Sequence, residues 1–204
     1  MERFVYSGFV TSTEDPKGLG RVQVELQGFD EAIELPWIRT VQTTASGKHG
    51  HMFMPEDGDE VMVLKGAGDD FDGMLVLGCV YNGSNKPNEA NNDGDNHTKQ
   101  IRTRSGHELT FYDEDGSEHI TIKTPDGKLS IEMDHSGVEI KVNSDDKITI
   151  SATSKVAVDA QEVTVEGANK VDIKSSAQVN VDGGQQVSVS ATAISLSGTT
   201  VSIG

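Results

Sequence analysis

The sequence predicts an all-β protein in two parts: a small N-terminal barrel and a C-terminal β-helix that three copies of the chain build together. Two observations support this prediction. Residues 1–83 contain five apolar segments separated by turn residues, a pattern typical of a small barrel. From Ile148 onward, aliphatic residues two positions apart recur every seven or eight residues. No segment shows a convincing helical period, so we expect strands throughout.

Residues 1–83 are predicted to form a five-stranded domain. Turn residues such as Asp57-Gly58 and the acidic run Asp69-Asp70-Phe71-Asp72-Gly73 separate its apolar segments. Five strands over this length suit a closed barrel of the OB type. The predicted strands are about Phe4–Ser12, Arg21–Gln27, Leu35–Gln42, Glu60–Lys65 and Met74–Tyr81.

A polar segment without periodicity, Ser84–Asn96, follows the barrel, and we interpret residues 84–98 as a linker. Residues 99–145 are predicted to form a neck and the start of the β-helix. Glycine-containing turns at Asp115-Gly116, Asp126-Gly127 and Ser136-Gly137 separate its strands. The apolar residues of this neck are Ile101, Leu109 and Phe111, then the pairs Ile120/Ile122, Leu129/Ile131 and Val138/Ile140.

Residues 146–204 are predicted to form a regular rod. Successive apolar pairs start 8, 7, 8, 8, 8, 7 and 7 residues apart. In an extended chain, residues two apart share a face, so both members of each pair point to one side. All residues between pair members are polar except Ala157. The predicted trimer core is Ile148, Ile150, Val156, Val158, Val163, Val165, Val171, Ile173, Val179, Val181, Val187, Val189, Ile194, Leu196, Val201 and Ile203.

The short period indicates that one chain cannot enclose its own core. About eight residues leave room for one strand and one turn, whereas single-chain β-solenoids use roughly 20 or more residues per coil. Several chains must therefore close the coil. The simplest closure takes one strand from each of three chains, which predicts an obligate, intertwined homotrimer with a triple-stranded β-helix.

Composition narrows the possible partners. The net charge of −16 argues against binding of nucleic acid or anionic lipid by electrostatics. The first residues show no signal peptide and no stretch could span a bilayer, so we expect synthesis in the cytoplasm. The one cysteine, Cys79, lies in an apolar run and is expected to be a small buried side chain, with a reactive thiol as the alternative.

Several polar motifs are weighed as sites, and we predict no catalytic residue, no cofactor and no metal. His49-Gly50-His51 has chelating spacing but lies within the barrel. His119 and His135 would be tripled by three-fold symmetry and could hold an ion on the axis if they faced inward; a solvated histidine is the alternative. Ser105-Gly106-His107 lacks the strand-turn-helix surroundings of a catalytic serine and is interpreted as part of a strand. Asp113-Glu114-Asp115 ends in the turn residues Asp115-Gly116 and is interpreted as a turn.

The N-terminal part of the chain contains four motifs: Gly20–Val24, Pro36–Arg39, Gly50–Val61 and Val76–Gly83. These motifs resemble the VgrG and phage baseplate spike family, also called baseplate assembly protein V. They occur in that family's order and spacing, and Arg102–His107 is similar to the family's neck after the barrel. With the octad repeats, the resemblance covers nearly the whole chain.

The resemblance implies a trimeric central spike of a contractile injection system. That machine would be a phage tail, an R-type bacteriocin, an extracellular injection particle or a type VI secretion system. In such machines the OB domains sit at the baseplate hub and the rod pierces the target cell envelope on sheath contraction. The chain lacks the large N-terminal hub domains of VgrG, which implies a separate hub protein.

The C-terminal segment is expected to receive a separate PAAR-type tip protein. Residues 183–204 contain no charged side chain, and they lack the His-x-His with which some family members bind iron. An uncharged tip could also enter a membrane, or simply reflect what fits a narrow β-helix. The expected docking residues are Thr199, Thr200, Val201, Ser202, Ile203 and Gly204.

Two other functions are considered. A trimeric tailspike would degrade surface polysaccharide with carboxylates along the rod, such as Glu132, Asp134 and Glu139. A trimeric adhesin would bind a receptor, but adhesins normally carry a signal peptide and aromatic residues at the tip, which are missing here. We expect a spike that transmits force and is not an enzyme.

Overall fold

The computed structural model describes residues 4–66, 71–89 and 91–202, and it is all-β apart from a single 3-10 turn, η1 (Phe71–Gly73). The all-β prediction is therefore confirmed. The chain forms two compact units, Met1–Ile148 and Thr149–Gly204. The finer boundaries at residues 83, 98 and 145 stay predictions. Two residues of the acidic turn, Asp69 and Asp70, lie outside the described part.

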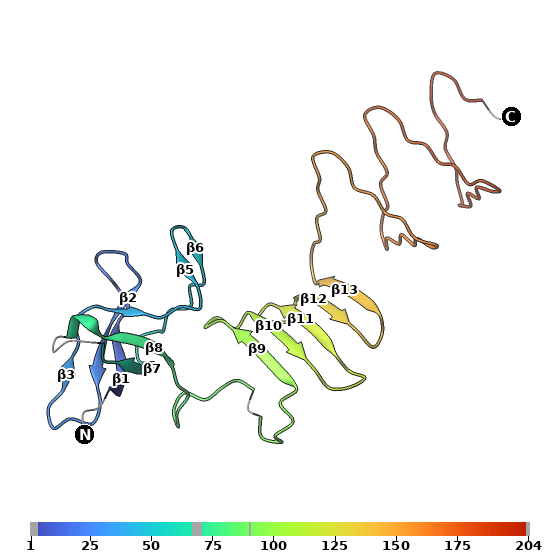
Figure 1. Cartoon of the computed structure of the whole chain (residues 1–204). Helices are drawn as coiled ribbons and strands as arrows, with labels where there is room; N and C mark the ends of the chain where they lie inside the picture. The colour runs from blue at the N-terminus through green and yellow to red at the C-terminus, as the bar shows by residue number, and fades with distance from the viewer. Residues whose placement is uncertain (1–3, 67–70, 90, 203–204) are drawn as a thin grey trace. The chain divides into compact units, whose positions relative to one another are not determined.

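Five strands close the N-terminal barrel in the order β1-β7-β8-β4-β2, because β1 pairs with both β7 and β2 (Figure 1). The pairing of β4 with β8 is parallel, and β3 extends the sheet along β2. This arrangement confirms the OB-like barrel. The strands are β1 (Val5–Ser12), β2 (Arg21–Leu26), β3 (Ile33–Glu34), β4 (Ile38–Thr40), β7 (Glu60–Leu64) and β8 (Leu75–Cys79).

The third predicted strand differs from the observed chain path. Instead of one strand over Leu35–Gln42, β3 and β4 flank a break at residues 35–37. Pro36 has no amide hydrogen and interrupts strand pairing at this point. Leu35 still donates its backbone N–H to the Val24 carbonyl oxygen at 2.8 Å. A hairpin that the sequence did not predict follows, formed by β5 (Ala45–Ser46) and β6 (His49–Gly50).

The barrel core consists of aliphatic side chains that alternate along the strands. In β2 the buried positions are every second residue, Val22, Val24 and Leu26. Gly8 allows β1 to cross close to β2, because a Cβ at this position would lie 2.5 Å from Val24 Cγ1. The whole buried set is Val10, Val22, Val24, Leu26, Leu35, Ile38, Val61, Val63, Met74 and Val76.

Cys79 is exposed, so the prediction of a buried thiol was wrong. It is the last residue of β8, and the buried part of that strand ends at Val76. Its Sγ lies 4.0 Å from Asp59 Oδ2. Partial burial and the Asp59 carboxylate raise the pKa of the Cys79 thiol, so the thiol stays protonated and is a poor nucleophile.

Residues after the linker form a five-stranded antiparallel sheet in which each strand pairs with the next along the chain. The predicted glycine turns connect these strands, and Gly116 and Gly127 adopt the positive φ that such turns require. The neck is thus a single-chain sheet and not yet a shared helix. Its strands are β9 (Thr98–Arg102), β10 (Glu108–Tyr112), β11 (His119–Lys123), β12 (Leu129–Asp134) and β13 (Glu139–Ser144).

One predicted pair in this region, Val138/Ile140, does not form. Val138 lies in the β12–β13 turn with φ 51° and is 91% exposed. The strand starts after it, so the partner of Ile140 on the same face is Val142. The pairs Ile120/Ile122 and Leu129/Ile131 lie within β11 and β12 as predicted.

A buried carboxylate joins three strands on one face of the sheet. Glu108 on β10 is 8% exposed and pairs with Arg102 on β9 and with Lys123 on β11, whose Nζ lies 2.8 Å from Glu108 Oε2. The Lys123 hydrogen bond, with the charges of both cations, lowers the pKa of Glu108 below its usual value. The ionised form therefore stabilises the folded sheet.

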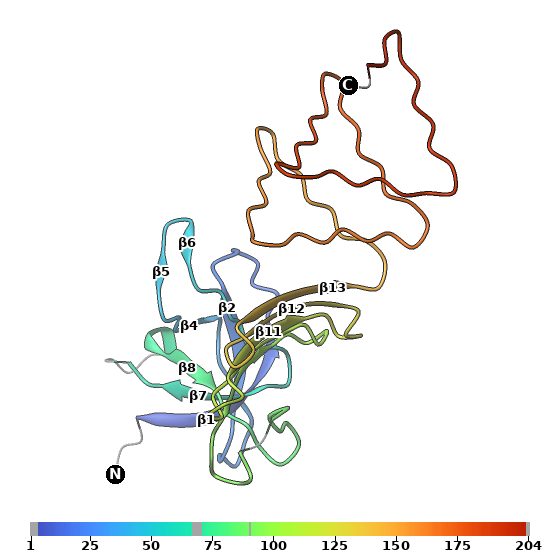
Figure 2. The same ribbon diagram turned by 90° about the vertical axis from the view of Figure 1, so that its right-hand side faces the viewer.

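Residues 149–202 wind as a widely spaced, three-sided coil (Figure 2). No strand pairing occurs among these residues in the isolated chain. Backbone corners connect the sides, and at Gly183 a Cβ would lie only 2.2 Å from the Gln186 carbonyl oxygen. The backbone of this unit thus has a defined path but no hydrogen-bonded sheet of its own.

The Glu108 network predicts a pH dependence of stability. Because the folded-state pKa of Glu108 lies below the unfolded value of about 4.3, its stabilisation is complete above that pH and is lost as the pH falls through the folded pKa. Glu108→Gln should lower resistance to urea at about pH 6 and flatten the decline toward about pH 3. Glu31→Gln, at an exposed loop position, is the control and should change neither. An unchanged acid profile in Glu108→Gln would show that this carboxylate does not stabilise the sheet.

Candidate trimer interface

One face of the five-stranded sheet is apolar across all its strands. The pairing register aligns Ile101, Leu109, Ile122, Ile131 and Val142 in one row that runs from β9 to β13. A second row aligns Phe111, Ile120, Met133 and Ile140, with Lys99 at its β9 position.

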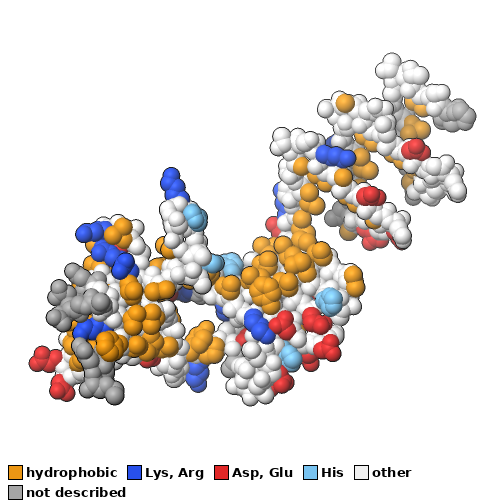
Figure 3. All heavy atoms as spheres, viewed as in Figure 1, with side chains coloured by type: hydrophobic (Ala, Val, Ile, Leu, Met, Phe, Trp, Pro, Cys, Tyr) orange, Lys and Arg blue, Asp and Glu red, His pale blue; other side chains and the backbone are white. Residues whose placement is uncertain are grey.

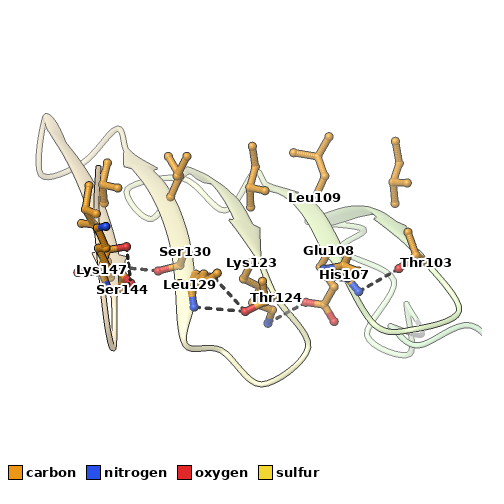
Figure 4. Close-up of a pocket in the computed structure, with 16 residues that line it drawn as sticks. Thr103, His107, Glu108, Leu109, Lys123, Thr124, Leu129, Ser130, Ser144 and Lys147 are labelled. Atoms are coloured by element: carbon orange, nitrogen blue, oxygen red, sulfur yellow. Dashed lines mark hydrogen bonds and ion pairs between the residues drawn. The ribbon is translucent and has the colours of Figure 1, made fainter. Parts of the chain in front are cut away.

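This apolar face is open to solvent in the single chain. For example, Phe111 is 40% exposed and Ile140 is 69% exposed. Figure 3 shows the hydrophobic side chains gathered over the sheet. The row that contains Leu109 lines a hollow of about 500 Å³, and in Figure 4 Leu109 points into it while Glu108 lies on the other side of the strand. A continuous apolar surface of this extent marks an interaction site.

The opposite face of the same sheet is polar. It carries Glu108 with its two cations and, in another row, Tyr112 and His119, whose rings stack with centroids 5.0 Å apart. The Nδ1 of His119 lies 2.8 Å from the Ser117 carbonyl oxygen. His135 is exposed in the β12–β13 turn. His119 therefore does not lie on the apolar face, where an ion on a three-fold axis would require it.

The predicted core residues of the rod are exposed in the isolated chain. Those described range from 50% exposed, at Val171 and Val179, to 78% at Ile150. Ile203 lies outside the described residues. In the described part of the chain, half or more of each of these residues stays exposed, and their role as a trimer core stays a prediction. Those described are Ile148, Ile150, Val156, Val158, Val163, Val165, Val171, Ile173, Val179, Val181, Val187, Val189, Ile194, Leu196 and Val201.

The polar residues of the rod share a side of the chain, as the alternation predicts. Asp172 accepts ion pairs from Lys170 at 2.8 Å and from Lys174 at 3.1 Å, so all three side chains lie together. One repeat later, Gln178 donates to Asn180 Oδ1 at 2.7 Å. The apolar side chains between them therefore have the other side of the strand to themselves.

The expected tip-docking residues are only partly described. Thr199, Thr200, Val201 and Ser202 are exposed, whereas Ile203 and Gly204 lie outside the described residues. No charged side chain occurs between Gly183 and Ser202. Tip docking at these residues stays a prediction.

The polar motifs considered as chemical sites hold ordinary structural contacts. His49 and His51 are exposed at the β5–β6 hairpin, where His51 Nδ1 lies 3.0 Å from Thr43 Oγ1. Ser105 lies in the β9–β10 turn, 3.3 Å from Thr103 Oγ1. In the described part of the chain, no group of three or more His, Cys, Asp or Glu side chains is arranged to hold a metal ion.

The carboxylates that a polysaccharide-cleaving site would use are already engaged. Glu139 and Glu132 both pair with Lys141, at 3.0 and 3.7 Å. Asp134 accepts hydrogen bonds from the Gly137 N–H at 2.9 Å and the Ser136 hydroxyl at 2.8 Å. These bonds lower the pKa of Asp134, so it stays ionised and suits a turn-stabilising role better than that of a general acid.

Sequence reasoning missed part of the candidate interface. Met133 and Val142 belong to the apolar face, and Glu108 anchors the polar one, yet none of the three was singled out. The signal was available in the alternation along β12 and β13, where every second residue is apolar. What hid it was the assumption that this region consists of the same kind of apolar pairs as the rod, which placed Val138 in a pair with Ile140.

Comparison with protein families gives two matches. Residues 6–81 match a type VI secretion system/phage-baseplate injector OB domain. Residues 99–169 match a phage baseplate V C-terminal trimerisation domain. The first match covers the barrel, and the second covers the apolar sheet and the first repeats of the rod. No curated protein matches the chain.

None of the described segments contains a helix long and apolar enough to cross a membrane. Both matched domain models are phage-baseplate models, and they follow one another along the chain. The chain therefore belongs to the phage baseplate V family of spike proteins and is a trimeric protein of the baseplate type.

Proposed function

We propose that this protein is the central spike of a contractile injection system, whose rod pierces the target cell envelope when the sheath contracts. The observation that carries the proposal is the set of exposed aliphatic pairs along residues 148–201, joined to a domain that matches a trimerisation domain. An isolated chain with this surface would aggregate. Three copies related by a three-fold axis bury it.

The first part of the shared core is the apolar face of β9–β13. Three copies of a sheet with one apolar face can turn these faces toward a common axis, like the sides of a prism. The rows that contain Leu109 and Phe111 would then meet the corresponding rows of the other two copies. The polar faces, with Glu108, remain outside in contact with water.

The second part of the core is the rod, where the chain follows the three sides of the coil in turn. The coil is three-sided (Figure 2), and the apolar pairs recur every seven or eight residues, so we assign one pair to each side and three pairs to each turn of one chain. Three strand spacings of about 4.8 Å raise the chain by about 14 Å per turn, which leaves room for one strand from each of the other two copies. Every strand of the rod then pairs only with strands of other chains.

This interleaving supports a mechanical function. No strand can leave the rod without breaking hydrogen bonds with two other chains, and unfolding of one chain exposes the core of all three. Such assemblies unfold slowly, and slow unfolding is the relevant measure of resistance to an applied force. We propose that the protein transmits force and is not an enzyme.

The proposal includes partners at both parts of the chain. The barrel would dock on a separate baseplate hub protein, and the uncharged segment that includes Thr199–Ser202 would carry a PAAR-type tip protein. The protein would be made in the cytoplasm and assembled into the particle there. The matched OB-domain model is described for type VI secretion systems and phage baseplates. The proposal also includes an R-type bacteriocin or an extracellular injection particle as the machine.

A polysaccharide-degrading tailspike is the alternative from another class of function. The lysine and turn contacts of Glu132, Asp134 and Glu139 speak against it. The pure protein, incubated with capsule or lipopolysaccharide, should release no reducing sugar above a boiled control. Release of reducing sugar would overturn the proposal that the spike is purely mechanical.

Val181→Asp tests the inward direction of the apolar pairs. In the proposed rod it places three carboxylates against one another on the axis, and unpaired buried ions cost several kcal/mol each. Light scattering should therefore find no normal trimer. The matched control is Asn180→Asp, which adds the same charge at the neighbouring outward position and should leave the trimer intact. Normal assembly of Val181→Asp would refute the inward assignment.

Removal of residues 183–204 tests the tip-docking role. The shortened chain keeps the sheet and five of the eight rod pairs, so it should still form a trimer. It should no longer retain the PAAR-type protein of the same machine in a pull-down in which the full chain does. A shortened trimer that still retains that protein would place the docking surface elsewhere.

A further inference from the structure

We propose that Val138, in the β12–β13 turn, fills a hollow on the opposite edge of the five-stranded sheet of a neighbouring copy, so that the three sheets lock edge to edge. The inference rests on the proposed arrangement of three sheets around one axis, and it adds the contact that joins each sheet to the next. The apolar faces account for the centre of that arrangement and leave its three corners open.

Val138 has a backbone conformation that does not suit its residue type. Its φ is 51°, a region that glycine adopts readily and that β-branched residues avoid. Among the described residues, the non-glycine positions with positive φ are Lys48, Asn96 and Val138, and only Val138 is β-branched. Val138 is also 91% exposed. A strained valine gains little from burial in its own chain, so a contact with another chain accounts for it better.

The turn fixes Val138 at a place where it extends the apolar face. Asp134 accepts hydrogen bonds from the Ser136 hydroxyl at 2.8 Å and the Gly137 N–H at 2.9 Å, which hold the turn in shape. Val138 borders a second hollow of about 640 Å³, which Ile140 of the apolar face also lines. Its side chain is therefore continuous with the face that the trimer would bury.

The opposite edge of the sheet contains a complementary hollow. It measures about 560 Å³ and lies between the β11–β12 turn and the residues that follow β13. Pro125 and Leu129 give it an apolar surface, and Lys128 and Asp145 border it. Because Leu129 also lines the hollow beside Leu109, this edge too is continuous with the apolar face.

The turn and the hollow lie at opposite ends of the same two strands. Val138 lies where the chain passes from β12 to β13 (Figure 1), and at the other end of these strands the Asp145 N–H donates to the Lys128 carbonyl oxygen at 3.1 Å. Rotation about a three-fold axis parallel to the apolar rows moves no residue along that axis. The turn of one copy therefore meets the hollow of the next at the same level, and three such contacts close into a ring.

Val138→Gly tests whether this side chain has a partner, because the direction of its effect differs between the two cases. Glycine suits a φ of 51°, so a valine without a partner should give a variant at least as resistant to urea as the parent. The proposed contact predicts dissociation of the trimer at a lower urea concentration, since three hollows lose their filling. The matched control is Lys48→Gly, at φ 68° in the exposed β5–β6 hairpin, which should not weaken the trimer. Equal or greater resistance of Val138→Gly would overturn the contact.

Disulfide trapping tests where the side chain lies. In a Cys79→Ser background, Val138→Cys with Lys128→Cys should oxidise to a covalent trimer on a denaturing, non-reducing gel. Within one chain these two positions lie at opposite ends of β12, about 20 Å apart, which is beyond the reach of a disulfide. The bond can therefore only join two copies.

Two further variants give the controls. Val138→Cys with Ser105→Cys uses the same edge as Lys128 but a turn three strand spacings away, about 14 Å along the axis, and should stay monomeric on the gel. Val138→Cys alone should give no covalent dimer, whereas a dimer would show that the valines meet one another. The native mass is measured before oxidation. A trimeric mass without the Val138–Lys128 bond, or with the Val138–Ser105 bond, overturns the edge contact alone, and a monomeric mass overturns the proposed trimer itself.

Discussion

Burial of aliphatic side chains that one chain cannot cover is the constraint on which the rest of the molecule depends. Each described apolar side chain of the rod is at least half exposed in the single chain, and no strand pairing occurs among residues 149–202. In the proposed trimer, strands from two other copies would supply apolar contacts and backbone partners at once. On this account the trimer is a condition of folding for residues 149–202, whereas the barrel already has its own core.

Backbone pairing differs between the five-stranded sheet and the rod. Between Thr98 and Ser144, glycine turns reverse the chain, and each strand pairs with its neighbour in the sequence. Beyond Ile148 the corners change direction without reversing it, so successive segments of the backbone lie on different sides of the coil (Figure 2). The first arrangement leaves only one apolar face for other copies to cover. In the second arrangement the backbone edges are also left for other copies to pair with. The rod therefore depends on the other copies more than the sheet does.

The elements most accessible to sequence reasoning were those with strict periodicity. The turn residues and alternating strands predicted the barrel, and the glycine turns of the sheet were placed correctly. The break at Pro36 was missed because the flanking residues are apolar enough to read as one strand. Cys79 was misplaced for a related reason: an apolar run does not reveal where burial ends.

The candidate interface was predicted only in its regular part. The aliphatic pairs stand out because they repeat, but Met133 and Val142 became apparent only once the pairing register aligned them with Leu109 and Ile122. The Glu108 network is likewise a property of three strands brought together, since Arg102 and Lys123 are distant from one another in the sequence. Cross-strand neighbours depend on register, which local patterns do not specify.

The central claim is that three chains close one core, and the native mass in solution tests it most directly. Light scattering of the purified protein, before and after mild detergent, should give about 65 kDa, three times the 21.8 kDa of the chain, in both conditions. Detergent competes for apolar surface, so a mass that survives it indicates that the pairs are enclosed. A mass near that of one chain would contradict the account, because the apolar pairs would then have no neighbours to cover them.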